Sequence, residues 1–109
     1  MLKKKERLTK EQFDHFFKVG FRVHSPSVQI IVANSPTFHG CVVVGKKVYK
    51  KAVDRNKLRR RLYAMLYNYA KQSALKKTFI VVAKPPITKL TKTALHTEFI
   101  EALAKATSL

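Results

Sequence analysis

The chain has 109 residues, of which 46% are hydrophobic, so it is long enough for one domain with a modest core and too short for two. Lys and Arg total 23 against 6 Asp and Glu, and the net charge of +17 predicts a polyanionic partner. No apolar run approaches the ~18 residues of a membrane-spanning helix, and the charge is spread over several segments, which disfavours a membrane surface as that partner.

The N-terminus is predicted to hold a basic arm followed by a short helix. Residues 1–8 are rich in Lys and Arg and are expected to have no structure of their own in isolation. Thr9 and Gln12 fit the spacing of a capping box, so a helix is expected to begin after Thr9. Gly20 is placed to end this helix in a left-handed C-cap.

Three phenylalanines share one face of that helix, because Phe13, Phe16 and Phe17 stand at i, i+3 and i+4. Such a group is more often part of a core than a binding surface. If one or two ring faces stay open, however, they could stack on unpaired bases. A short helix that buries only part of its aromatic face would satisfy both interpretations.

Strand patterns occupy most of the next segment. Residues 21–24, 28–33 and 41–45 have the β-rich composition of strands, and the second and third most simply form an antiparallel pair around a loop rich in turn formers. Residues 78–83 are almost continuously apolar, which predicts an interior strand covered on both faces. A last helix is expected to start within residues 88–91.

A basic helix between these strands is the most informative element. It is expected to start at Asp54 as N-cap, because apolar residues recur from there with the spacing of one helical stripe. The stripe consists of Leu58, Leu62, Met65, Leu66 and Tyr69. A basic run is usually a solvated face of mixed sign, but Asp54 is the only acid between Lys46 and Arg61. The arginines also match phosphate geometry, so we expect RNA as the partner.

Together these elements predict one α+β domain over residues 1–109, with the order α-β-β-β-α-β-α. We expect a two-layer sandwich with a sheet of about four strands and helices mainly on one side. One face of the sheet is expected to form a groove beside the first helix.

The sequence predicts neither a metal site nor a disulfide. The histidines lack metal-ligand spacing and no carboxylate cluster accompanies them, so no protein-bound cofactor or small-molecule substrate is expected. Cys41 is the single cysteine, which suits a reducing compartment. The N-terminus has no apolar segment typical of a secretory signal, and we expect a cytoplasmic protein.

The order of elements and one motif resemble a known family. Lys46-Lys47 followed by Ala52-Val53-Asp54-Arg55-Asn56-Lys57-Leu58-Arg59-Arg60 is similar to the Arg-Asn-Arg signature of the bacterial ribonuclease P protein subunit. The likeness covers nearly the whole chain, including the phenylalanine helix, the Val-Val-Val strand and the Phe-Ile-Val-Val-Ala-Lys-Pro strand.

The resemblance implies a fold related to a ribosomal-protein domain, the second domain of ribosomal protein S5, with a left-handed crossover through the signature helix. It implies a non-catalytic subunit of an endoribonuclease that matures the 5′ end of tRNA, in which Mg²⁺ is held by the catalytic RNA. The protein would act as a monomer in that holoenzyme, with the catalytic RNA and precursor tRNA as partners.

Each partner is expected to contact its own set of residues. The basic segment and signature helix would bind the catalytic RNA, and a cleft beside the first helix would bind the single-stranded 5′ leader. The RNA-binding set is Lys46, Lys47, Lys50, Lys51, Arg55, Asn56, Lys57, Arg59, Arg60 and Arg61. The leader-binding set is Phe13, Phe16, Phe17 and Ile31.

Several departures from the family pattern fall within these sets. Arg61 replaces a usual apolar residue, and the approach Val48-Tyr49-Lys50-Lys51 lacks the family's usual Gly and is one residue longer. Lys57 stands where the signature has its second Arg, which weakens bidentate phosphate recognition there. Ile31 replaces an aromatic residue of the cleft, which reduces stacking on the leader.

Two other classes of protein remain as alternatives. A ribosomal RNA-binding protein of similar charge could use the same helix, although it would not need the Arg55-Asn56 signature beside Lys46-Lys47. A helix-turn-helix DNA binder would need two adjacent helices joined by a short turn, whereas strand patterns flank the basic helix.

Overall fold

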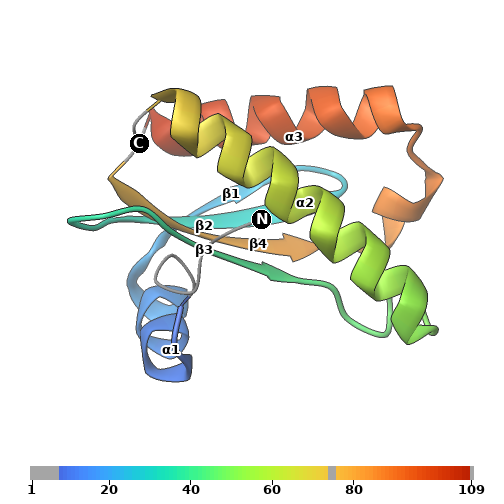
Figure 1. Ribbon diagram of the computed structural model, residues 1–109, viewed down its shortest axis with the longest axis horizontal. Helices are drawn as coiled ribbons and strands as arrows, with labels where there is room; N and C mark the ends of the chain where they lie inside the picture. The colour runs from blue at the N-terminus through green and yellow to red at the C-terminus, as the bar shows by residue number, and fades with distance from the viewer. Residues whose placement is uncertain (1–7, 74–75, 109) are drawn as a thin grey trace.

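The computed structural model describes residues 8–73 and 76–108 and shows a four-stranded sheet with helices on both faces (Figure 1). The predicted basic arm lies outside the described residues except for Leu8. In chain order the elements are α1 (Lys10–Val19), β1 (Phe21–His24), β2 (Val28–Asn34), β3 (His39–Val43), α2 (Ala52–Ser73), β4 (Lys77–Ala83), the 3₁₀ helix η2 (Pro85–Lys89) and α3 (Lys92–Thr107). This order confirms the predicted one, with η2 as an addition.

The start of α1 is capped as predicted. The Thr9 hydroxyl accepts a hydrogen bond from the Gln12 amide at 3.2 Å, and the Gln12 side chain accepts one from the Thr9 amide at 2.9 Å. The predicted left-handed cap at Gly20 is wrong, because its φ of −70° and ψ of 156° are extended. Glycine is needed there for space: a Cβ would lie 2.5 Å from Cγ2 of Ile31 and 2.8 Å from the Phe16 carbonyl oxygen.

The strands are ordered β1-β2-β4-β3. β2 is antiparallel to both β1 and β4, whereas β3 is parallel to β4. The predicted antiparallel pairing of residues 28–33 with 41–45 is therefore wrong, since β4 lies between the two strands. α2 carries the chain from β3 back across the sheet, and this crossover makes the β3–β4 pair parallel. The central position of β4 confirms the interior strand predicted from its apolar composition.

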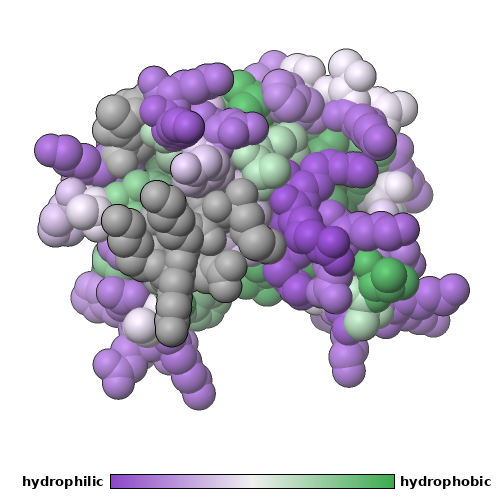
Figure 2. Space-filling model, in the orientation of Figure 1, coloured by the Kyte–Doolittle hydropathy of each residue, from purple (hydrophilic) through white to green (hydrophobic). Residues whose placement is uncertain are grey.

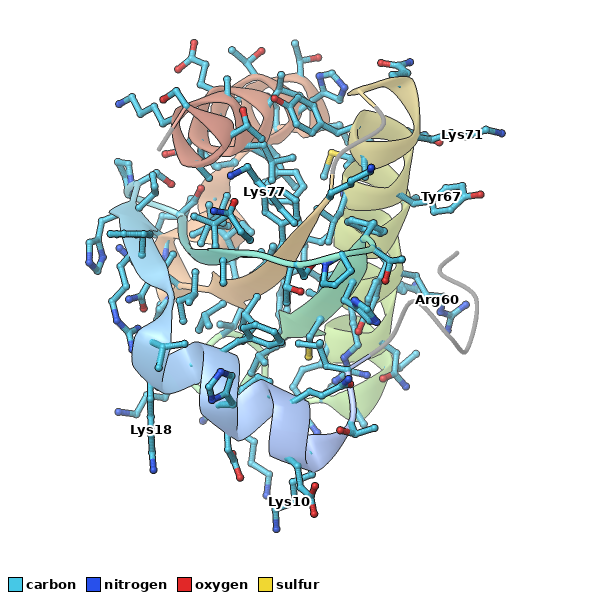
Figure 3. All side chains as sticks on the ribbon, turned by 90° about the vertical axis from the view of Figure 1, so that its left-hand side faces the viewer. Lys10, Lys18, Arg60, Tyr67, Lys71 and Lys77 are labelled. Carbon is cyan, nitrogen blue, oxygen red and sulfur yellow. The ribbon has the colours of Figure 1, made fainter. Side chains whose placement is uncertain are left out.

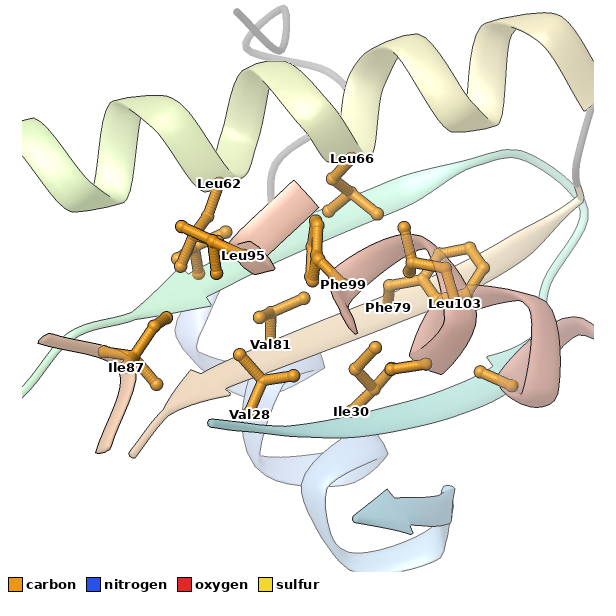
Figure 4. Packing of buried hydrophobic residues seen from close by; sticks show 14 of the residues in the cluster. Val28, Ile30, Leu62, Leu66, Phe79, Val81, Ile87, Leu95, Phe99 and Leu103 are labelled. Carbon is orange, nitrogen blue, oxygen red and sulfur yellow. The ribbon is translucent and has the colours of Figure 1, made fainter. Parts of the chain in front are cut away.

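The main core lies between the sheet and the helices α2 and α3, which cover the same face (Figure 1). Side chains from all three parts meet there, as Figure 4 shows. The labelled core residues are Leu62 and Leu66 of α2, Leu95, Phe99 and Leu103 of α3, Ile87 of η2, and Val28, Ile30, Phe79 and Val81 of the sheet. α1 packs against the opposite face, so helices mainly on one side are confirmed.

The two later helices begin close to where the sequence predicts. α3 starts after Thr91, whose hydroxyl accepts from the Ala94 amide at 3.1 Å, within the expected window. α2 starts at Ala52, so the prediction of Asp54 as N-cap is wrong. Asp54 instead lies in the first turn of α2, where a negative charge still favours the positive end of the helix dipole.

Candidate RNA-binding surfaces

The apolar stripe of α2 holds the helix in one orientation on the sheet. Leu58, Leu62 and Leu66 are buried, and Leu62 and Leu66 have no exposed surface. Met65 and Tyr69 pack against the same cluster, so the predicted stripe is confirmed. Burying each leucine contributes roughly 1.5–3 kcal/mol. The charged residues of α2 are consequently carried by a rigid element and not by a mobile tail.

The opposite side of α2 is strongly basic and exposed. Lys57, Arg60 and Arg61 are all exposed. Figure 3 shows Arg60, Tyr67 and Lys71 projecting away from the body of the molecule along the helix. In Figure 2, hydrophilic side chains gather over the N-terminal half of α2. Lys71 continues this surface for about three turns beyond Arg60, although the sequence motif did not single it out.

The segment leading into α2 is organised by hydrogen bonds to Arg55. Nη1 of this half-buried residue donates to the carbonyl of Tyr49 at 3.0 Å and to that of Lys50 at 2.7 Å. Backbone bonds from Val48 and Tyr49 to the Gly45 carbonyl close the preceding turn. The exposed predicted residues of this segment are Lys46, Lys47, Lys50 and Lys51. Arg55 therefore positions these lysines relative to the helix.

A third side of α2 faces the edge strand β3. Nη1 of Arg59 donates to Oδ1 of Asn56 at 2.7 Å, so two predicted RNA-binding residues are joined to each other. Burial raises the pKa of the nearby Cys41 thiol, while a hydrogen bond from Tyr63 and the positive charge of Arg59 oppose that rise. The neutral thiol is therefore favoured, which agrees with a small partly buried side chain and not with a reactive nucleophile.

The aromatic face of α1 is only partly covered. The rings of Phe13 and Phe17 stack with centroids 5.6 Å apart and an angle of 23° between their planes. Phe17 remains 37% exposed, while Phe13 and Phe16 are half-buried. The guanidinium carbon of Arg22 lies 4.7 Å from the centre of the Phe17 ring, and Nη2 of Arg22 donates to the Phe17 carbonyl at 2.7 Å.

Arg22 is thus a member of this aromatic surface that the sequence analysis did not include. Its only sequence signal was its place in the alternating segment directly after the helix. A guanidinium plane can itself stack on a base, and its charge can bind a phosphate. Ile31, by contrast, is 1% exposed, and its Cγ2 lies directly beneath Gly20. Its side chain supports α1 from below and offers almost no surface to a ligand.

Next to α1, part of the sheet remains accessible. Strand alternation places Gln29 and its register partner Val82 on the face opposite the main core. Val43 is paired with Val82 in turn, and all three are partly exposed. These three side chains therefore lie on the same face of the sheet as α1 (Figure 1). The predicted groove beside the first helix stays a prediction, and this is the face on which it would lie.

Within residues 8–73 and 76–108, no three His, Cys, Asp or Glu side chains are grouped as ligands for a metal ion. Over the same residues, no helix is both long enough and apolar enough to cross a membrane.

Sequence comparison identifies related proteins. The family described as Ribonuclease P matches residues 2–107. The Ribonuclease P protein component of Phytoplasma australiense is 40% identical over 68 residues, covering 62% of this chain and 58% of the relative. That of a Nitratiruptor species is 34% identical over 79 residues, covering 72% of this chain and 71% of the relative. The first match thus spans less than two thirds of that relative's length.

Solved structures share the fold. The Staphylococcus aureus RNase P protein superposes with a TM-score of 0.75 at 22% identity, covering 93% of this chain and 94% of that chain. The Thermotoga maritima RNase P protein gives a TM-score of 0.72 at 17% identity, covering 92% and 96%. These likenesses confirm the predicted fold class, and the sequence matches confirm the family resemblance.

Proposed function

The chain belongs to the ribonuclease P family, and from this premise we propose that it is the protein subunit of an endoribonuclease that matures the 5′ end of tRNA. In this proposal the chemistry is carried by a catalytic RNA, which also holds the Mg²⁺ ions. The holoenzyme hydrolyses a phosphodiester to release the 5′ leader. The protein supplies charge and a binding surface for the leader.

The observation that carries the proposal is the rigid placement of cations on α2. Lys57, Arg60 and Arg61 are exposed on a helix whose opposite side is buried in the core. Neutralising phosphates with such fixed cations releases counterions, which favours binding and makes it depend on salt. It also allows two polyanions, the catalytic RNA and the substrate, to approach each other. We therefore assign α2 and the Arg55-organised turn to the catalytic RNA.

The leader is assigned to the aromatic surface of α1. Phe17 is partly exposed beside Phe13 and Arg22, and stacking on aromatic rings recognises unpaired bases with little sequence preference. This division between two surfaces predicts that variants will separate the two binding events.

The test of α2 is the affinity for catalytic RNA measured over a range of salt concentrations. Arg60→Ala should weaken binding and lower the salt slope by about 1. Lys105→Ala removes the same charge from an exposed position on α3 and should leave both quantities near those of the unaltered chain. Equal effects of the two variants would show that only overall charge matters and would contradict docking through α2.

The test of α1 compares precursor tRNA with mature tRNA, which lacks the leader, as ligands of the reconstituted holoenzyme. Phe17→Ala should reduce the preference for the precursor, because stacking is worth about 1–3 kcal/mol per base. Phe21→Ala is the matched control, because Phe21 is also an exposed phenylalanine, at 67%. It is paired with Val32, whose side chain faces the main core, so the Phe21 side chain lies on the face of the sheet away from α1. An unchanged preference in Phe17→Ala would refute the assignment.

RNA recovered with the purified protein separates the classes of function. A catalytic RNA together with precursor tRNA supports the proposal. Recovery of ribosomal RNA instead would indicate a structural RNA-binding protein of the ribosomal type and overturn it.

A further inference from the structure

A cavity of about 240 Å³ opens where the turn before α2 meets the first turns of the helix. Its walls are Tyr49, Asp54, Lys57, Leu58 and Arg61. The volume is below the ~300–1,000 Å³ of pockets that hold drug-sized ligands, so the cavity suits a smaller fragment such as one nucleobase. The hydrogen bond from Arg55 to the Tyr49 carbonyl holds the aromatic wall in place against the helix.

The carboxylate in this cavity is unexpected on a surface that binds phosphates. Asp54 is the only acid between Lys46 and Arg61, and it is not the N-cap of α2. The helix dipole favours a negative charge in the first turn of α2, but a carboxylate repels phosphate, so Asp54 opposes simple phosphate binding at this cavity. An ion pair with Lys57 on an exposed helix would be worth only about 0.3–0.5 kcal/mol, and a ligand could readily replace it.

A carboxylate oxygen accepts hydrogen bonds and cannot donate them. Among the bases, guanine presents two adjacent donors on its Watson–Crick edge, the ring imino group and the exocyclic amine, which match the two oxygens of one carboxylate. An aromatic wall such as Tyr49 can stack on the base, and Leu58 supplies an apolar contact. Lys57 and Arg61 also line the cavity, and their charges can bind the phosphates of the same nucleotide.

We propose that this cavity binds one unpaired guanine of an RNA strand, with Asp54 as the residue that selects the base. The inference rests on the proposed RNA-binding role of α2 and adds base selection to it. It changes the character of the surface, because cations alone bind any sequence, whereas a carboxylate among them gives one position a preference.

The test uses short single-stranded oligoribonucleotides that differ at one position, with guanine, inosine or adenine there, titrated into the full-length chain. The strand with guanine should bind roughly 5- to 150-fold more tightly than the strand with adenine. Inosine should lie between them, because it keeps the imino donor and lacks the amine. NMR shifts of the Tyr49 and Asp54 amides should accompany binding of the guanine strand.

Asp54→Ala should abolish the preference, because no acceptor remains for the two guanine donors, while binding of the adenine strand stays equal or improves, because a repulsive charge is removed. Glu101→Ala removes the same charge from an exposed position of α3 and should keep the preference. Guanosine monophosphate alone should bind more weakly than the guanine strand; equal affinity would make the free nucleotide the ligand and contradict an RNA site.

The proposal is overturned if the unaltered chain shows no preference for guanine, or if Asp54→Ala retains it. The first of these measurements needs no variant, so it decides the matter even where a substitution impairs folding. If base selection fails, Arg60→Ala can still weaken binding of the catalytic RNA, as the proposed function expects. Failure of base selection is therefore distinguishable from failure of the proposed function.

Discussion

Gly20 joins α1 to the sheet, and its replacement by alanine tests how the aromatic surface is held. The new Cβ would lie 2.5 Å from Cγ2 of Ile31, 2.8 Å from the Phe16 carbonyl oxygen and 3.1 Å from that of Val32. Two of these atoms belong to the backbone, and Ile31 is fully packed, so α1 must shift. The Phe16 oxygen also accepts the hydrogen bond from the Gly20 amide that ends the helix.

The magnitude follows from two opposing effects. Overpacking a dense site costs about 1–3 kcal/mol. Alanine also restricts the unfolded chain, which returns about 0.4–1 kcal/mol. The net loss should be roughly 1–2 kcal/mol, which lowers the Tm of a domain of this size by roughly 5–15 °C. Urea unfolding followed by circular dichroism measures the loss directly.

Gly45→Ala is the matched control, because no atom beyond its two chain neighbours lies within 4 Å of a Cβ built there. It should leave the free energy of unfolding unchanged or raise it slightly. A double-mutant cycle with Ile31→Ala, which removes the methyl group that is closest to the new Cβ, should show coupling of at least about 0.5 kcal/mol. Equal free energies of unfolding for Gly20→Ala and Gly45→Ala would refute the assignment of close packing at position 20.

Three further predictions concern the core, the turn before α2 and the thiol of Cys41 in β3. Leu62→Ala, at a position with no exposed surface, should lower the free energy of unfolding by about 2–5 kcal/mol; a loss below about 1 kcal/mol in urea unfolding would contradict its place in the core. Arg55→Ala removes the donor to the Tyr49 and Lys50 carbonyls. Because Arg55 supports the turn in which the Tyr49 amide bonds to the Gly45 carbonyl, hydrogen exchange of that amide should become faster. Unchanged exchange would show that the turn is stable without Arg55. Because burial raises the pKa of the Cys41 thiol, iodoacetamide should alkylate it more slowly at pH 8 in the folded chain than in urea, and equal alkylation rates would refute the shift. The stability linked to the neutral thiol should be lost as the pH rises above the ordinary thiol pKa of 9.0.

Features set by neighbouring residues could be predicted from the sequence. The capping box at Thr9 and Gln12 depends on a spacing of three, and it forms as expected. The stripe of α2 depends on helical periodicity, and its leucines are buried. The apolar run of β4 marked it as interior, and it has a strand on each side.

Features set by distant residues could not be predicted in this way. Nothing in residues 28–45 shows that β4, more than thirty residues later, comes between β2 and β3. The need for glycine at position 20 arises from Ile31 of another strand, so helix-end statistics pointed to a left-handed cap instead. Arg55 reads as one more phosphate ligand in the motif, and only the tertiary structure shows its bonds to the preceding turn.

The geometry of α2 separates two groups of outward-facing residues with different neighbours. Lys57 and Arg61 lie at the cavity that contains Asp54, whereas Arg60, Tyr67 and Lys71 project along another side of the helix. The second group extends over roughly 16 Å at 1.5 Å per residue, without a carboxylate among its members. An RNA strand that follows the second group would meet only charge and an aromatic ring, which any sequence satisfies. In our proposal, selection of a base therefore arises where a strand passes the first turns of α2, beside the Asp54 carboxylate.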